Sequence, residues 1–116
     1  MSKAKNVPNQ FTNGWLSQLD KRTNISQEMR ARHMALTDDL GGSDKLSYQQ
    51  LSLVERSLWL EYFLAEQEKV LATGGDFDSG RWTQAVNSLQ GIYAKLGLDR
   101  VRQVKSVAEY LTARGN

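Results

Sequence analysis

Residues 48–72 read YQQLSLVERSLWLEYFLAEQEKVLA, a run of strong helix formers that neither glycine nor proline interrupts. Ser47 and Gln50 stand three residues apart at its start, which is the pattern of a capping box. The apolar side chains project onto nearly all sides of such a helix, and a helix of this kind must be buried on nearly all sides. We therefore expect copies of the chain to cover part of it. The interface residues predicted for this oligomer are Leu53, Trp59, Leu60, Phe63, Leu64 and Leu71.

A second helix is expected over about residues 79–97, where apolar residues recur at helical spacing. The preceding turn, TGGDFDSG, offers Asp78 or Ser79 as the N-cap, and Gly97 is placed for the residue that follows a helix end. Because the turn is short, these two helices should lie antiparallel as a hairpin. Gly91 inside the second helix predicts a close approach of another backbone, since glycine costs a helix about 1 kcal/mol relative to alanine.

The remaining sequence predicts two further helices. One covers about residues 24–38, with Thr23 or Asn24 as its cap and two glycines after its end. The other follows Asp99. Residues 1–22 contain lysines, asparagines, a proline and scattered apolar residues, so we expect a basic flexible arm. The predicted fold is all-α: the arm and one helical domain over residues 23–116, built on the hairpin.

Charge and composition limit the class of protein. The chain has 116 residues, no cysteine and a net charge of +2. Residues 1–32 carry six Lys or Arg against two acids, residues 38–78 three against nine, and residues 81–116 six against two. Absence of cysteine excludes disulfides and thiolate metal sites. No apolar run is long enough to cross a bilayer, and no secretory signal is apparent. We expect a cytoplasmic protein without a membrane partner.

No set of residues predicts catalysis. Gly75 and Gly80 have the spacing of a phosphate-binding loop, but the required Lys and Ser/Thr are missing and Asp76 and Asp78 lie in between. His33 is the only histidine and falls on the apolar stripe of the helix at 24–38, which is typical of a packing residue. We therefore predict no enzyme, no catalytic residue, no cofactor and no metal.

Nucleic-acid binding is the chemistry that the charge pattern favours. Phosphate contacts need basic side chains on an accessible segment, and the N-terminal third supplies them together with Phe11 and Trp15. No helix-turn-helix fits this region, because a single helix precedes the glycines at 41 and 42. The predicted DNA-binding residues are Lys3, Lys5, Lys21, Arg22, Arg30 and Arg32.

The order of features over residues 39–100 resembles that of small phage proteins encoded near DNA-packaging genes, among them terminase small subunits. The shared features are a helix with the pair Glu55-Arg56, a turn at 74–76, the Asn-x-Leu of residues 87–89, and the sequence Leu-Gly-Leu of residues 96–98 followed by Arg100. The resemblance implies a non-enzymatic protein that assembles into rings through a helical hairpin and recognises viral DNA for packaging. Its implied partners are double-stranded DNA, further copies of the chain and a terminase large subunit.

Two functions therefore stand as predictions. The first is an oligomeric DNA-binding protein of phage type that resembles a terminase small subunit. The alternative is a protein-binding helical module without DNA binding, such as a phage assembly accessory protein or an inhibitor of a host system. In the family that the chain resembles, an N-terminal helix-turn-helix binds DNA, and residues 1–38 here do not match that part.

Overall fold

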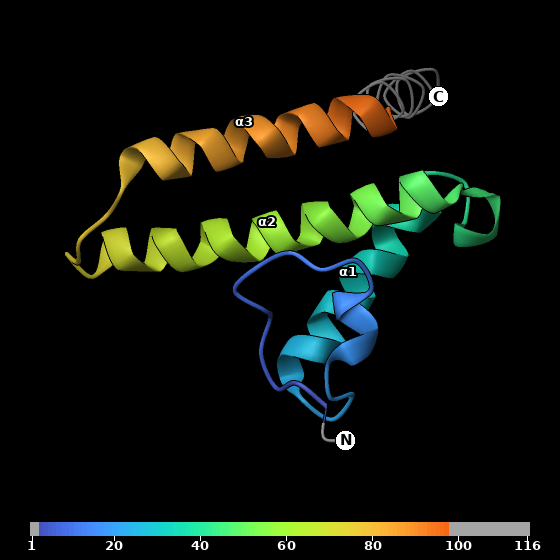
Figure 1. The fold of residues 1–116 in the computed structure, drawn as a ribbon, viewed down its shortest axis with the longest axis horizontal. Coiled ribbons are helices and arrows are strands. Elements are labelled where there is room, and N and C mark those ends of the chain that lie inside the picture. Colours follow the sequence, from blue (N-terminus) through green and yellow to red (C-terminus); the bar gives the residue numbers. More distant parts are fainter. Residues whose placement is uncertain (1–2, 98–116) are drawn as a thin grey trace, which may run out of the picture.

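The computed structural model describes residues 3–97, and Figure 1 shows how they are arranged. The elements are the 3-10 turns η1 (Trp15–Gln18) and η2 (Ser43–Lys45) and the α-helices α1 (Asn24–Asp39), α2 (Tyr48–Ala72) and α3 (Ser79–Leu96). Within residues 3–97 the only β-type pairing is an isolated bridge between Ala4 and Leu19. The predicted all-α class is thus confirmed for this part, and the predicted C-terminal helix lies outside the described residues.

Local side-chain contacts explain where the helices begin. The Thr23 hydroxyl accepts a hydrogen bond from the Ser26 N–H at the start of α1. At the start of α2, Ser47 and Gln50 form the complete capping box that their spacing predicts. Each bond satisfies a backbone group that the first helical turn leaves unpaired, so the predicted helix starts are confirmed.

The third helix also begins and ends as predicted. The Asp78 carboxylate accepts a hydrogen bond from the Arg81 N–H at its start. At its end, Gly97 has φ 78° and ψ 15°, the left-handed conformation that glycine adopts without a steric penalty. The N-cap and the helix end were both predicted from sequence, and both predictions are confirmed.

Helices α2 and α3 lie side by side and antiparallel, as the hairpin prediction required (Figure 1). Val54 of α2 packs with Ile92 and Leu96 of α3, and Leu53 and Leu60 lie partly buried against them. The other side of α2 is covered by α1 and by the N-terminal segment, which we define as residues 3–19 (Figure 1). None of the helices of residues 3–97 is both long and apolar enough to span a membrane.

The N-terminal segment differs from the expected flexible arm. Its residues Val7, Trp15, Leu16 and Leu19 are buried and form a core cluster with Met29 of α1 and Leu58 of α2. Trp15 is 2% exposed and its indole N–H donates to the Glu55 carbonyl over 3.1 Å. Val7, Phe11, Trp15 and Leu19 recur every four residues, but the segment contains only the short turn η1, so their contacts in the fold identify them as core. Burial of this apolar surface holds the segment in place.

A single chain covers more of α2 than the sequence suggested. Val54, Ser57 and Leu58 are fully buried, and Leu64 is 8% exposed. Two different layers supply this cover, α3 on one side and α1 with the N-terminal segment on the other (Figure 1). The argument that copies of the chain must cover α2 therefore applies only to its partly exposed positions.

Within residues 3–97, Gly91 has no close neighbour of the kind that was predicted for it. It is exposed, and a Cβ atom added there would meet no atom within 4 Å. Because alanine loses less conformational entropy in a helix, we expect Gly91→Ala to raise the free energy of unfolding by about 0.5–1 kcal/mol. Urea denaturation of both proteins measures the difference. A loss of stability on this substitution would contradict the open surroundings of Gly91.

Candidate functional site

Four predicted DNA-binding residues lie together at one end of the molecule. A bridge between Ala4 and Leu19 joins two parts of the chain. In this bridge the Ala4 N–H donates to the Gln18 carbonyl (2.9 Å), and the Asp20 N–H donates to the Ala4 carbonyl (2.7 Å). It brings the residues on either side of Ala4 next to those that follow Leu19. We call the resulting group the basic tip; it consists of the exposed residues Lys3, Lys5, Lys21 and Arg22.

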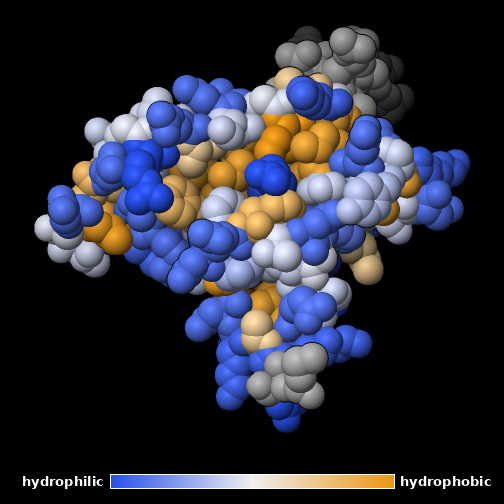
Figure 2. All heavy atoms as spheres, in the orientation of Figure 1, coloured by the Kyte–Doolittle hydropathy of each residue, from blue (hydrophilic) through white to orange (hydrophobic). Residues whose placement is uncertain are grey.

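The basic tip faces solvent at the end of the molecule where the N-terminus lies (Figures 1 and 2). The surface there is mostly hydrophilic in Figure 2. Lys3 donates to the Ser17 carbonyl over 3.3 Å, and Arg22 forms an ion pair with Asp20 over 3.0 Å. Lys5 and Lys21 form no ion pair with any residue in 3–97. Three net positive charges therefore remain at this end once Asp20 is included.

The other two predicted DNA-binding residues make contacts inside the fold. Arg30 donates to the Ser26 hydroxyl and to the Leu16 carbonyl, so it joins α1 to the N-terminal segment. Arg32 forms ion pairs with Glu28 (2.9 Å) and with Glu61 of α2 (3.0 Å). A DNA phosphate would have to compete with these partners. Arg30 and Arg32 remain predictions as contact residues, and the basic tip is the part that the fold assembles.

The Asp20–Arg22 pair gives a prediction about pH. Hydrogen bonds from the Arg22 side chain and backbone lower the pKa of Asp20 from 3.8 to about 2. A carboxylate whose folded-state pKa is lowered stabilises the fold fully above its unfolded pKa, and this contribution is lost as pH falls through the folded value. We expect Asp20→Asn to reduce stability at pH 5–7 and the difference from the unsubstituted protein to vanish as pH falls from about 4 to 2. Thermal unfolding at a series of pH values measures this, and a pH-independent difference would contradict it.

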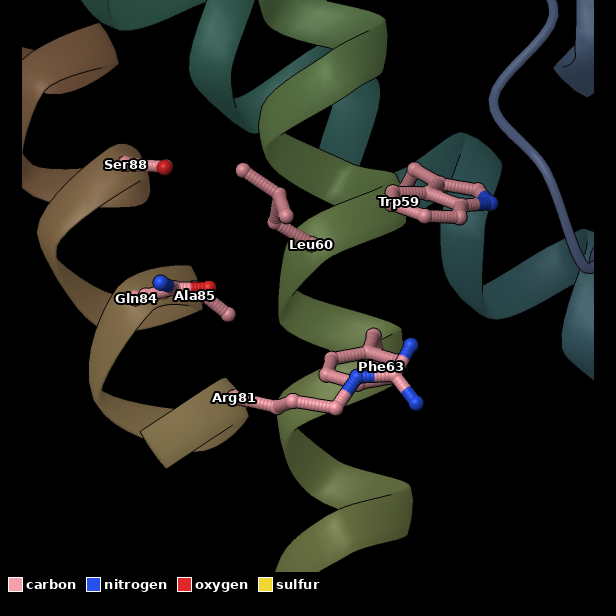
Figure 3. A pocket seen from close by; sticks show the side chains of 7 residues that line it. All are labelled: Trp59, Leu60, Phe63, Arg81, Gln84, Ala85 and Ser88. Atoms are coloured by element: carbon pink, nitrogen blue, oxygen red, sulfur yellow. The ribbon is translucent and has the colours of Figure 1, made fainter. Parts of the chain in front are cut away.

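A second candidate site is a groove between α2 and α3, lined by apolar and polar side chains and shown in Figure 3. Its volume is about 210 Å³. The Trp59 and Phe63 rings stack with an interplanar angle of 13° and a centroid separation of 6.3 Å. The Arg81 side chain reaches from α3 toward α2, and its guanidinium carbon lies 5.8 Å from the Phe63 ring centroid, which is within cation–π range (Figure 3). The lining residues are Trp59, Leu60, Phe63, Arg81, Gln84, Ala85 and Ser88.

The groove contains half of the predicted oligomer interface. Trp59, Leu60 and Phe63 line it, and hydrophobic side chains gather along the contact between α2 and α3 on the face seen in Figure 2. Arg81, Gln84 and Ser88 were not predicted to belong to a site. Their spacing of three to four residues places them on one face of α3, but sequence alone does not show which face of α3 borders the groove.

The other three predicted interface residues occupy different environments. Leu53 is partly buried against the contact between α2 and α3, and Leu64 is buried within the chain. Leu71, near the end of α2, is 57% exposed. Burial within the chain already accounts for Leu64, and Leu71 is the predicted interface residue that is most available to another copy. Assembly through these positions remains a prediction.

Some partly buried titratable side chains join one helix to another. The Tyr93 hydroxyl of α3 donates to the Glu61 carboxylate of α2, which also pairs with Arg32 of α1. Burial and this carboxylate raise the pKa of Tyr93. His33 is half-buried, and burial lowers its pKa, as expected for a packing histidine. In residues 3–97 no three side chains of the His, Asp or Glu type lie where they could hold one metal ion.

Comparison of the chain with protein-family models, with curated proteins and with solved structures gives no match. The resemblance to terminase small subunits therefore rests on the residues quoted above. Two of them acquire a role in the fold: Glu55 and Arg56 both contact the N-terminal segment, since Arg56 lies over the Phe11 ring with 4.1 Å between its guanidinium carbon and the ring centroid. The candidate functional sites are therefore the two that the fold itself assembles, the basic tip and the groove.

Proposed function

We propose that this chain is a non-enzymatic, oligomeric DNA-binding protein of phage type, which acts like a terminase small subunit in recognising viral DNA for genome packaging. The observation that carries the DNA-binding half is the basic tip, where Lys3 and Lys5 stand beside Lys21 and Arg22. Clustered cations attract a polyanion more strongly than dispersed ones, because their electric fields add. Each phosphate contact then releases condensed counterions.

Assembly is supported by the hairpin and by its groove. The resemblance implies rings built through a helical hairpin, and α2 with α3 forms such a hairpin. The groove on it exposes part of Trp59 and Phe63, and aromatic side chains are enriched in protein interfaces. The implied partners are further copies of the chain, double-stranded DNA and a terminase large subunit. A location in the cytoplasm of a phage host belongs to the same proposal.

The test is the salt dependence of binding to a short DNA duplex. With all four residues of the basic tip in contact with phosphates, the slope of log K against log salt concentration should be about −3.6, from about −0.9 per contact. Replacing Lys5 and Lys21 together by glutamine removes two contacts, so the slope should become shallower, at about −1.8. Lys95→Gln, an exposed substitution on α3, is the control and should leave the slope unchanged. Absence of duplex binding at low salt would disprove the DNA-binding half of the proposal.

A protein-binding module without DNA binding is the second candidate. The observation that favours it is the groove, in which Arg81 forms no ion pair with residues 3–97 and so offers a positive charge beside apolar side chains. The same salt titration separates the two functions. A chain that fails to bind DNA but forms a stable complex through the groove would belong to this second class.

A further inference from the structure

Besides the apolar burial, one carboxylate of α2 binds the backbone of the N-terminal segment. The Gly14 N–H donates to Glu55 Oε2 over 2.9 Å, and the Leu16 N–H donates to Glu55 Oε1 over 3.2 Å. Trp15, between them, donates its indole N–H to the Glu55 carbonyl. Gly14 has φ 86°, and this left-handed residue before η1 turns the two N–H groups toward one anion. Hydrogen bonds from neutral donors to a charged acceptor are stronger than those between neutral groups.

The same short segment connects Glu55 to the basic tip. Element η1 covers Trp15–Gln18, and the next residue, Leu19, is fully buried and pairs with Ala4. The Leu16 carbonyl also accepts a hydrogen bond from Arg30. A shift of η1 away from Glu55 would therefore move the backbone with which Ala4 pairs. That pairing places Lys3 and Lys5 beside the residues that follow Leu19.

We infer that Glu55, an acidic residue on α2, is a positioning residue for DNA binding, because it holds the N-terminal segment in the arrangement that assembles the basic tip. This inference rests on the proposed function. Glu55 itself contacts no phosphate and would repel one. Its effect on binding is indirect, through the positions of Lys3 and Lys5.

Coupling of this kind is reciprocal. If docking of the N-terminal segment raises affinity for DNA, bound DNA must stabilise the docked segment by the same factor. The amide protons of Gly14 and Leu16 should therefore exchange more slowly with solvent when a duplex is bound. Amides within α3 should respond less, because the buried residues of the segment pack with Met29 of α1 and Leu58 of α2.

The experiment compares Glu55→Ala and Glu55→Gln with the unsubstituted chain. Alanine removes both acceptors, whereas glutamine keeps one, so glutamine should give an intermediate effect. Asp78→Ala is the matched control, since it removes the cap of α3 without touching the N-terminal segment. Hydrogen exchange at Ala4 and Asp20, whose N–H groups pair the two sides of the bridge without bonding to Glu55, reports docking. The salt slope of duplex binding reports the number of phosphate contacts.

For Glu55→Ala we expect loss of amide protection at Ala4 and Asp20, which do not bond to Glu55. The salt slope should fall toward about −1.8, with affinity at 0.1 M salt reduced by up to about 60-fold, which corresponds to two lost contacts. Asp78→Ala should keep the slope of the unsubstituted chain. Unchanged protection in Glu55→Ala, or lost protection with an unchanged slope, would overturn the inference.

A different result would disprove the proposed function than would disprove the role of Glu55. If the unsubstituted chain does not bind the duplex, DNA binding is disproved whatever Glu55 does. Hydrogen exchange of the DNA-free proteins would then still decide whether Glu55 holds the segment. Failure of the proposed function and failure of the positioning role are therefore separate observations.

Discussion

Trp15→Ala is expected to lower the free energy of unfolding by about 3–5 kcal/mol, the range for truncating a large aromatic side chain in a core. Trp15 is 2% exposed and packs in the cluster that contains Leu58 of α2. The substitution would also leave the Glu55 carbonyl without the indole donor. A flexible arm, by contrast, would lose almost no stability on the same change.

Urea denaturation followed by far-ultraviolet circular dichroism measures this effect without relying on the tryptophan that is removed. Trp82→Ala is the matched control, because this third tryptophan is only partly buried and its indole N–H donates to the exposed Glu68. We expect Trp82→Ala to lower the free energy of unfolding by less than half as much as Trp15→Ala does. Equal stability of Trp15→Ala and the unsubstituted chain would show that residues 3–19 are not part of the core in solution.

The second large effect is the contrast between Leu64→Lys and Leu71→Lys. Leu64 is 8% exposed, so lysine there loses the apolar burial of leucine and brings a charge into the interior. We expect a loss of at least about 3 kcal/mol, since truncation of a buried leucine alone costs about 2–5 kcal/mol. Leu71 is 57% exposed, and the same change there should alter the stability of one chain by no more than about 0.5 kcal/mol.

Assembly is measured separately from stability, by sedimentation at micromolar protein concentration. If copies of the chain meet through the end of α2, Leu71→Lys should shift the population toward the monomer, because a lysine charge cannot be buried in an apolar interface without a partner. Leu64→Lys would reduce assembly only together with folding. An unsubstituted chain that is monomeric at this concentration would rule out the oligomeric part of the proposed function.

Helix boundaries were predictable because they depend on neighbours in the sequence. The capping box of Ser47 and Gln50 and the cap at Asp78 each join residues three positions apart. Gly97 ends α3 through its own backbone conformation. None of these contacts requires knowledge of the rest of the chain, so a sequence pattern is enough to find them.

The docking of residues 3–19 could not be predicted in this way. Glu55 lies about 40 positions from the backbone N–H groups that it binds, and no local pattern joins them. Phe11, Trp15 and Leu16 are large apolar residues in an otherwise polar stretch, and this was the available signal that the segment is not a free arm. For Gly91 the sequence predicted a contact that is missing: its position inside a helix implied a close neighbour, and residues 3–97 do not supply one.

The sequence by itself determined three helices, their caps, the hairpin and the presence of basic residues in the N-terminal third, because short-range hydrogen bonds and apolar periodicity encode these features. Only the tertiary structure decided which basic residues stand together. It also showed that one chain buries Leu64, and that Trp59 and Phe63 line a groove beside Arg81. Such features depend on contacts between residues far apart in the chain, and these contacts form only when apolar surfaces from several segments are buried against one another.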